Sequence, residues 1–168
     1  MRFTNKPSPS FLDRFNDVRQ IINNFNDHYL ENYTPSWLSC LDESMNYFLD
    51  KFCPGFMSVP QEPHPLGNEY HSIEDGDEGN PVMYWIKIQE GKDRPKYANV
   101  KWAFPSRFEG ENKNTGRKYT KNSILMCEMT VPLHGTGKIV STDSGFCVTV
   151  GILHLHEHSV YGKLLIKQ

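Results

Sequence analysis

The chain opens with apolar residues at helical spacing. Side chains of this kind recur at intervals of three or four positions, at Phe11, Phe15, Val18, Ile22, Phe25 and Tyr29. This spacing places them on one face of a helix of about 20 residues. Pro9-Ser10 opens the helix, and Thr34-Pro35 ends it because a residue before proline avoids helical geometry. Residues 1–8 are expected to form a flexible leader to a single domain over 9–168.

Three strands are predicted between residues 37 and 89. The segment 37–45 is largely apolar and carries Asp42 near its end, and 67–73 is a shorter second strand. The third, 81–89, is the clearest, because apolar side chains alternate with others along its length. The polar stretch 74–80 is rich in Gly, Asp and Asn, so it predicts a turn that joins the second and third strands into a hairpin.

Helices and strands alternate in the carboxyl-terminal half. After a polar loop over 91–121, Asn122 or Ser123 can cap a helix over 124–131 that Pro132 stops. A strand over 138–142, a helix over 147–158 and a strand over 160–167 follow. Three consecutive strands followed by this alternation predict an α/β fold with a mixed sheet and flanking helices. In such a sheet the first and fourth strands can be parallel neighbours.

Two aspartates stand at strand ends about a hundred residues apart. Asp42 lies near the end of the first strand, and Asp143 follows the fourth. If these strands are parallel neighbours, both carboxylates meet at the edge of the sheet where open α/β sheets bind ligands. A converging carboxylate pair is suited to holding Mg²⁺ for phosphoryl transfer. Such a site normally needs a third acid, and no residue after Asp143 is a good candidate.

The net charge of −2 hides a segregation of charge along the chain. Residues 91–121 carry nine Lys and Arg against three Asp and Glu, whereas 61–90 carry one Lys against seven acids. The basic stretch is either a solvated loop or a surface that meets phosphate. If it binds DNA, the residues expected to do so are Lys92, Arg94, Lys96, Arg117, Lys118 and Lys121.

The cysteines and the terminal segment indicate an intracellular protein. No two of the four cysteines form a C-x-x-C pair, so we expect free, buried thiols rather than a zinc knuckle. No apolar run approaches the roughly 18 residues that a membrane span needs, and the amino terminus does not resemble a signal peptide. We therefore expect a nuclear or cytoplasmic protein without a membrane partner.

Short motifs in a fixed order extend from about residue 9 to the carboxyl terminus. They are YTP at 33–35, LDESM at 41–45, CPGF at 53–56, VP at 59–60, PHPLGNEYH at 63–71, EGKDRP at 90–95, PLHGTGK at 132–138, DSGF at 143–146 and GKLLIK at 162–167. Together they resemble the catalytic domain of piggyBac-type DDE transposases and the proteins derived from these elements.

The resemblance implies an RNase H-like fold with the strands, counted along the chain, in the order 3-2-1-4-5. In that family three or four acids bind two Mg²⁺ ions, which activate water or a 3′-hydroxyl to cut and join DNA. By position Asp42 is similar to the first catalytic acid, and Asp143 to the second. Glu43 should point away from Asp42 on an alternating strand, so it is not expected to be a ligand.

The chain departs from the family pattern in ways that predict an inactive remnant or fragment. The family's third acid and its Cys-rich zinc module are both missing, and Gln61, Glu62 and Glu128 stand where cations are expected. We therefore expect Mg²⁺ not to be bound productively and DNA binding to be weak and non-specific. The incomplete domain should also associate with itself through a sheet face left uncovered near 160–167. The alternative is a domesticated, non-catalytic module that binds DNA or protein.

Histidines and aromatic residues offer two further, weaker candidates. His154 and His158 share a helical face at a spacing that can bind zinc, but no third ligand is evident, so a solvated polar face is the competing interpretation. His134 is expected in a turn or at a helix end. Trp85, Trp102 and Phe104 could stack on bases, although Trp85, in a strand, is more typical of a core residue.

Overall fold

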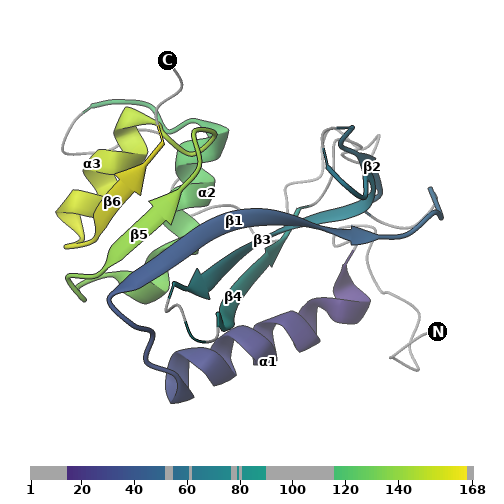
Figure 1. Ribbon diagram of the computed structural model, residues 1–168, viewed down its shortest axis with the longest axis horizontal. Coiled ribbons are helices and arrows are strands. Elements are labelled where there is room, and N and C mark those ends of the chain that lie inside the picture. The colour runs from purple at the N-terminus through teal and green to yellow at the C-terminus, as the bar shows by residue number, and fades with distance from the viewer. Residues whose placement is uncertain are drawn as a thin grey trace.

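The protein folds around a mixed sheet flanked by three α-helices (Figure 1). The computed structural model describes residues 15–51, 55–60, 62–76, 79, 81–89 and 116–165. The predicted leader, most of the basic loop, Cys53, Trp102 and Phe104 lie outside these residues. The elements are α1 (Asn16–Asn32), β1 (Leu38–Tyr47), β2 (Met57–Ser58), β3 (Leu66–Asp75), β4 (Met83–Ile88), α2 (Lys121–Met129), the 3-10 turn η1 (Val131–Leu133), β5 (Ile139–Thr142), α3 (Thr149–Glu157) and β6 (Tyr161–Leu164).

Strand β1 lies at the centre of the sheet. It pairs antiparallel with β3 on one side and parallel with β5 on the other. Strand β4 extends the sheet beyond β3, and β6 runs parallel to β5 at the far edge. The predicted α/β fold with the order 3-2-1-4-5 is confirmed, because the five predicted strands are β1, β3, β4, β5 and β6 in turn. The two-residue β2, which was not predicted, also pairs with β3.

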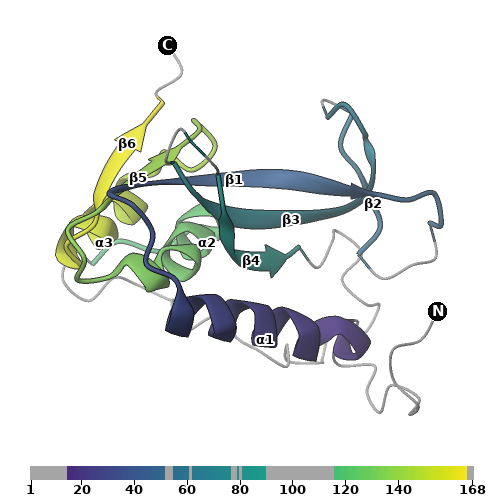
Figure 2. The same cartoon turned by 60° about the horizontal axis from the view of Figure 1, so that its bottom comes forward.

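All three helices lie on the same side of the β1–β3 pair, as Figure 2 shows. The core forms there, where Leu41 and Ile73 of the sheet meet Met126 of α2 and Leu155 of α3. These four side chains are at most 1% exposed. Trp85 packs against the same cluster, so it is part of the core, as its place in a strand suggested. The opposite face of β1 carries Cys40 and Asp42 and is covered by none of these helices.

Helix α1 attaches to the edge of the sheet through a polar residue in its buried face. The Asn26 side chain donates to Ile86 O and accepts from Ile86 N, both at 2.9 Å. It therefore satisfies the N–H and C=O groups of Ile86 on the side of β4 where no other described strand pairs. Phe15 and Ile22 are buried on the helix face that the sequence predicted. The helix ends at Asn32, close to the predicted stop at Thr34-Pro35.

A buried carboxylate fixes the start of β1. Asp75 is 4% exposed and accepts hydrogen bonds from Tyr33 Oη at 2.7 Å and Ser36 N at 2.8 Å, with a further short bond from Ser36 Oγ. Three donors offset most of the cost of burying this charge. The network joins the end of β3 to the segment between α1 and β1, so it sets where β1 enters the sheet.

Helix α2 begins three residues earlier than predicted. Its cap is Thr120, whose hydroxyl accepts from Ser123 N at 3.3 Å, while Thr120 N donates to Ser123 Oγ at 2.6 Å. The prediction took Asn122 or Ser123 for the cap, but both lie within the helix, and Ser123 is the third helical residue in a reciprocal capping box. Pro132 lies in η1 directly after the helix, so the predicted stop is close to its true end. Along the described residues, none of the helices combines the length and apolar character needed to cross a membrane.

Candidate metal site beside β1 and β5

Strand pairing brings the two predicted aspartates to the same level of the sheet. In the parallel β1–β5 ladder, Leu41 is the partner of Thr142. Asp143 follows directly after β5, whereas Asp42 lies in the middle of β1, which continues to Tyr47 because it pairs with β3 beyond the end of β5. The predicted position of Asp42 near the end of its strand is therefore wrong, and the predicted parallel pairing of the two strands is present. Both side chains are exposed.

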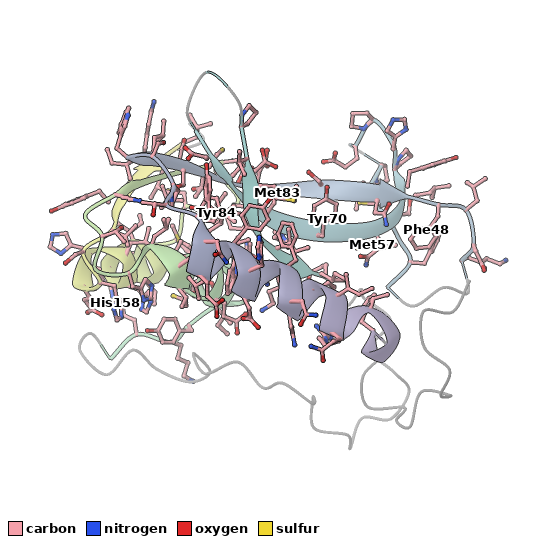
Figure 3. All side chains as sticks on the ribbon, turned by 90° about the horizontal axis from the view of Figure 1, so that it is seen from below. Phe48, Met57, Tyr70, Met83, Tyr84 and His158 are labelled. Carbon is pink, nitrogen blue, oxygen red and sulfur yellow. The ribbon has the colours of Figure 1, made fainter. Side chains whose placement is uncertain are left out.

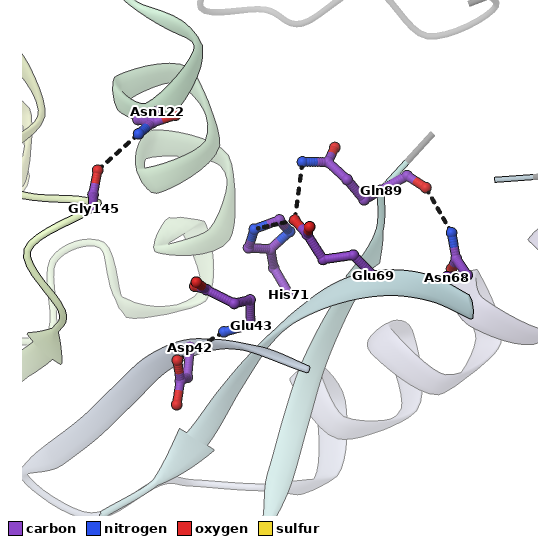
Figure 4. A network of polar contacts seen from close by, with 8 residues as sticks. All are labelled: Asp42, Glu43, Asn68, Glu69, His71, Gln89, Asn122 and Gly145. Atoms are coloured by element: carbon purple, nitrogen blue, oxygen red, sulfur yellow. Dashed lines mark hydrogen bonds and ion pairs between the residues drawn. The ribbon is translucent and has the colours of Figure 1, made fainter. Parts of the chain in front are cut away.

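Backbone donors orient both carboxylates. Asp42 Oδ1 accepts from the N–H of Glu43 at 2.9 Å, and Asp143 Oδ1 accepts from the N–H of Gly145 at 2.8 Å. A Cβ on residue 145 would lie 3.1 Å from that same Oδ1, so glycine leaves room for the tight turn. Asn122 on α2 donates to Gly145 O at 2.7 Å and ties the turn to the helix (Figure 4). The turn that holds Asp143 is therefore anchored from outside the strand.

The sequence did not predict that the environment of this site would affect Glu43. As strand alternation predicts, its side chain points to the opposite side from Asp42 (Figure 4). Yet burial, followed by the negative charges of Asp143 and then Asp42, raises the pKa of Glu43 to about 7. The charge of Asp143 therefore raises the pKa of Glu43 more than the charge of the adjacent Asp42 does. The turn after β5 carries the Asp143 carboxylate toward Glu43, which no spacing in the sequence reveals.

Further polar residues of β3 line the same side as Glu43. His71, its ladder partner, contacts Glu69 with Nε2 and Oε1 3.4 Å apart, and Gln89 donates to that Glu69 oxygen at 3.4 Å. The ring of Phe146 stands edge-on to His71 with centroids 5.8 Å apart. Glu69 is thus held by neighbours, and its charge adds to those that raise the pKa of Glu43.

The open face of β1 carries a thiol beside Asp42. Burial and the charges of Asp42 and Glu74 raise the pKa of Cys40, so this residue is a thiol at neutral pH. Cys127, on α2, is fully buried, and burial raises its pKa to about 12. Both are free, as is the half-buried Cys147, in agreement with the expectation of free thiols for the cysteines that the structure describes.

The proposed DNA-contacting residues are only partly described. Arg117 and Lys118 are exposed just before α2, whereas Lys92, Arg94, Lys96 and the side chain of Lys121 lie outside the described residues. Glu128, which stands where a cation was expected, forms an ion pair with Lys87 of β4. Its charge is therefore directed toward the sheet and largely compensated by Lys87.

A separate histidine cluster forms at the other end of β5. The sequence predicted that His154 and His158 share a helix face, but it gave no third ligand. The structure supplies His134, and the ligand atoms of the three rings lie within 4.8 Å of one another. Among the described residues this is the one such group of three; Asp42, Glu43 and Asp143 do not approach one another as closely.

Comparison with known proteins agrees with this architecture. Residues 1–167 match the family model described as Transposase IS4. The chain belongs to this transposase family. Its fold is similar to that of a solved piggyBac transposase, in a cryo-EM synaptic complex with hairpin DNA, with a TM-score of 0.70 and 18% identity. The likeness covers 94% of this chain, and this chain spans 28% of the length of that one. No curated protein matches the chain.

These findings confirm the predicted resemblance to the piggyBac-type DDE transposase domain and its RNase H-like fold. Membership of a DDE transposase family implies dependence on a divalent metal. The donor set fits such an ion, because carboxylate oxygens are the ligands that Mg²⁺ prefers and two exposed carboxylates, Asp42 on β1 and Asp143 directly after β5, come from paired strands. The accumulated negative charge around Glu43 would also be relieved by a cation.

Proposed function

We propose that this transposase-family domain binds a divalent cation, Mg²⁺ by chemistry, through Asp42 and Asp143, and that it does not cut or join DNA on its own. The observation that supports the proposal is the parallel pairing of β1 with β5, in which Asp42 and Asp143 each follow the last paired residue of the ladder. Their exposure leaves them accessible to an ion and to a phosphate group. The chain would then represent a remnant or fragment of a transposase core.

A bound divalent ion would supply Lewis-acid polarisation of a phosphate oxygen and activation of the attacking hydroxyl. The residues of this chain hold and orient the carboxylates: the N–H groups of Glu43 and Gly145 fix one oxygen of each aspartate. Two-metal phosphoryl transfer needs acids on more than one side of the ions, about 3.5–4 Å apart. Among the described residues, Asp42, Glu43 and Asp143 do not form a close group of three ligands, which supports binding without turnover.

Glu43 differs from the aspartates in its proposed role. Its side chain points away from Asp42, but the charge of Asp143 acts on it strongly. We infer that Glu43 adds negative potential next to the ion rather than a direct bond to it. Replacing Glu43 with Gln should therefore weaken cation binding less than replacing either aspartate.

Metal binding is tested by titrating the chain with Mn²⁺, which replaces Mg²⁺ and is visible by electron paramagnetic resonance. Asp42→Asn and Asp143→Asn should each weaken Mn²⁺ binding by at least about tenfold, because each removes an anionic ligand. Asp27→Asn, on the exposed surface of α1, is the matched control and should leave binding unchanged. Equal affinity in all three variants would contradict the proposed site.

Catalysis is tested with end-labelled duplex DNA in Mg²⁺ or Mn²⁺. Wild type, Asp42→Ala and Asp143→Ala should all leave the duplex intact. Nicking by the wild type that both substitutions abolish would show a working catalytic site, and the inactive interpretation would be wrong. Nicking that survives both substitutions would indicate a contaminating nuclease.

We also propose weak, salt-sensitive DNA binding through Lys92, Arg94, Lys96, Arg117, Lys118 and Lys121. The exposure of Lys118, next to the start of α2, supports a phosphate contact there. Lys118→Glu should lower affinity for duplex DNA and reduce the slope of log K against log salt by about 1 or more. Lys163→Glu, an exposed lysine on β6 with the same charge change, is the control. DNA binding that persists in Asp42→Asn would favour the domesticated, non-catalytic alternative.

A further inference from the structure

Three histidines, two from α3 and its cap and one from the segment before β5, converge at the carboxyl end of α3. His154 lies within the helix and is 3% exposed, His158 caps its end, and His134 follows η1. The ring centroids of His154 and His158 are 4.4 Å apart, and those of His134 and His154 are 5.3 Å apart. His134 and His158 are stacked at 4.2 Å. Figure 3 labels His158 at this end of the molecule, away from Tyr70 and Phe48.

Backbone hydrogen bonds hold the segment of His134 against the end of the helix. Gly135 N donates to His158 O at 2.7 Å, and Gly137 N donates to Ser159 O at 2.9 Å. Both glycines adopt positive φ, 75° and 70°, which lets the turn fold back at this point. The cluster is therefore built on a fixed scaffold rather than on side chains that meet by chance at the surface.

We propose that His134, His154 and His158 form a transition-metal site that binds Zn²⁺. The ligand atoms, within 4.8 Å of one another, need to close to about 3.3 Å to bind one tetrahedral ion at about 2.0–2.1 Å each. Closing this gap requires the stacked rings to rotate when the ion binds. Imidazole nitrogen suits Zn²⁺ and Co²⁺, whereas Mg²⁺ prefers oxygen. The carbonyl end of α3 adds favourable negative potential, and no Lys or Arg in its last turn competes for that position.

The ion would connect the segment leading into β5 with the end of α3. Three histidine ligands leave the fourth position of a tetrahedral ion open to water. Because the ion binds the folded chain and the unfolded chain lacks the cluster, Zn²⁺ should raise the melting temperature. At a hundredfold excess over the dissociation constant, the rise should be about 5–10 °C.

The test uses the full chain without a polyhistidine tag, stripped of metal and titrated with Co²⁺ in the presence of excess Mg²⁺. Magnesium occupies the carboxylate site, so the visible bands of four-coordinate Co²⁺ report nitrogen ligation. Wild type should develop these bands with one Co²⁺, and Zn²⁺ should abolish them. His134→Asn and His158→Asn should each lower affinity at least about tenfold. His156→Asn, an exposed histidine on the same helix outside the cluster, should bind as wild type does.

A second variant keeps the proposal falsifiable if the asparagine variants fold poorly. His158→Cys keeps a ligand at this exposed position and should add an intense thiolate-to-cobalt absorption that wild type lacks. Absence of visible bands in the wild type would overturn the proposal. So would affinity that falls equally in His156→Asn and His134→Asn, or His158→Cys bands identical to those of wild type.

Discussion

The two ends of strand β5 carry two different sets of metal-ligand side chains. At the carboxyl end, Asp143 lies beside β1, which carries Asp42 and Glu43; the two aspartates are exposed and Glu43 is half-buried. At the amino end, the segment of His134 meets the end of α3, and His154 is almost fully buried. The first set comes from neighbouring parallel strands, and the second from a turn against a helix. Strand topology could be inferred from the sequence, but the meeting of a turn with a helix end could not.

The largest expected effect comes from breaking the scaffold that both ends share. Leu41 precedes Asp42, pairs with Thr142 and is 1% exposed in the core. Leu41→Ala should lower the free energy of unfolding by about 2–5 kcal/mol, because it leaves a cavity among closely packed neighbours. Urea denaturation followed by circular dichroism measures the loss.

The matched control for Leu41→Ala is Leu30→Ala on α1, where the leucine is 55% exposed. That substitution should change the free energy of unfolding by less than about 0.5 kcal/mol. A loss below about 1 kcal/mol for Leu41→Ala would mean that the sheet is not packed against the helices as described. The description of both ends of β5 would then be wrong.

The next prediction distinguishes the two ends of β5 by the metal ion that each is expected to bind. Asp143→Asn should weaken Mn²⁺ binding by at least about tenfold and leave Co²⁺ binding at the histidines unchanged, since donor type selects the ion. His134→Asn should do the reverse. Measuring both ions on both variants gives the coupling between the sites. Substitutions that weaken both ions equally would show one site, or a fold defect, in place of two.

A smaller effect measures the free-energy cost of the negative charge around Glu43, near the carboxyl end of β5. Burial and neighbouring acids raise the pKa of Glu43 from 4.5 to about 7, so the folded chain binds more protons than the unfolded chain between these values. The free energy of unfolding therefore falls as the pH rises through this range. Glu43→Gln removes the ionisation and should stabilise the chain by about 1–2 kcal/mol near pH 8, after allowance for solvent screening.

The same substitution should have no effect below the unfolded-state pKa of 4.5, where Glu43 is protonated in both states. Urea denaturation in the presence of EDTA at both pH values tests this, with the exposed Glu31→Gln on α1 as control. An equal gain at low and high pH would indicate a packing effect. Added Mg²⁺ should shrink the gain at high pH, because a cation compensates the same charge.

Particular residues show what the sequence could and could not predict. The order of the sheet followed from alternation, turn residues and a family resemblance, because strand pairing preserves these regularities. The end of β1 did not, because β1 continues along β3 past the predicted end at residue 45, which leaves Asp42 in mid-strand. The effect of Asp143 on Glu43 was not predicted, since it depends on the turn after β5 and its anchor, the Asn122–Gly145 hydrogen bond. One residue beyond a strand, the direction of a side chain is set by tertiary contacts.

The histidine cluster was half predicted for a similar reason. The helical spacing of His154 and His158 is local, so the sequence gave their common face. His134 joins them through the two backbone bonds from Gly135 and Gly137 to the end of α3, which are long-range. A turn with two glycines just before a strand was the available signal, but it did not identify what the turn would contact. The predicted cap of α2 differs from the observed cap, Thr120. Serine is favoured both as a cap and as the third residue of a capping box, and Ser123 takes the second role.

The smallest expected effect concerns the outer edge beside β5. Strand β6 is an edge strand, and Tyr161 and Leu165 are 55% and 67% exposed there. Because unpaired strand edges with apolar side chains pair with other copies, we expect weak self-association through this edge. Leu165→Lys should raise the dimer dissociation constant about fivefold, since a lysine on an edge opposes strand addition. Sedimentation velocity measures it, with Leu30→Lys on α1 as the control for an exposed leucine. A chain that stays monomeric at high concentration, or equal effects of both substitutions, would show that this edge is not the contact.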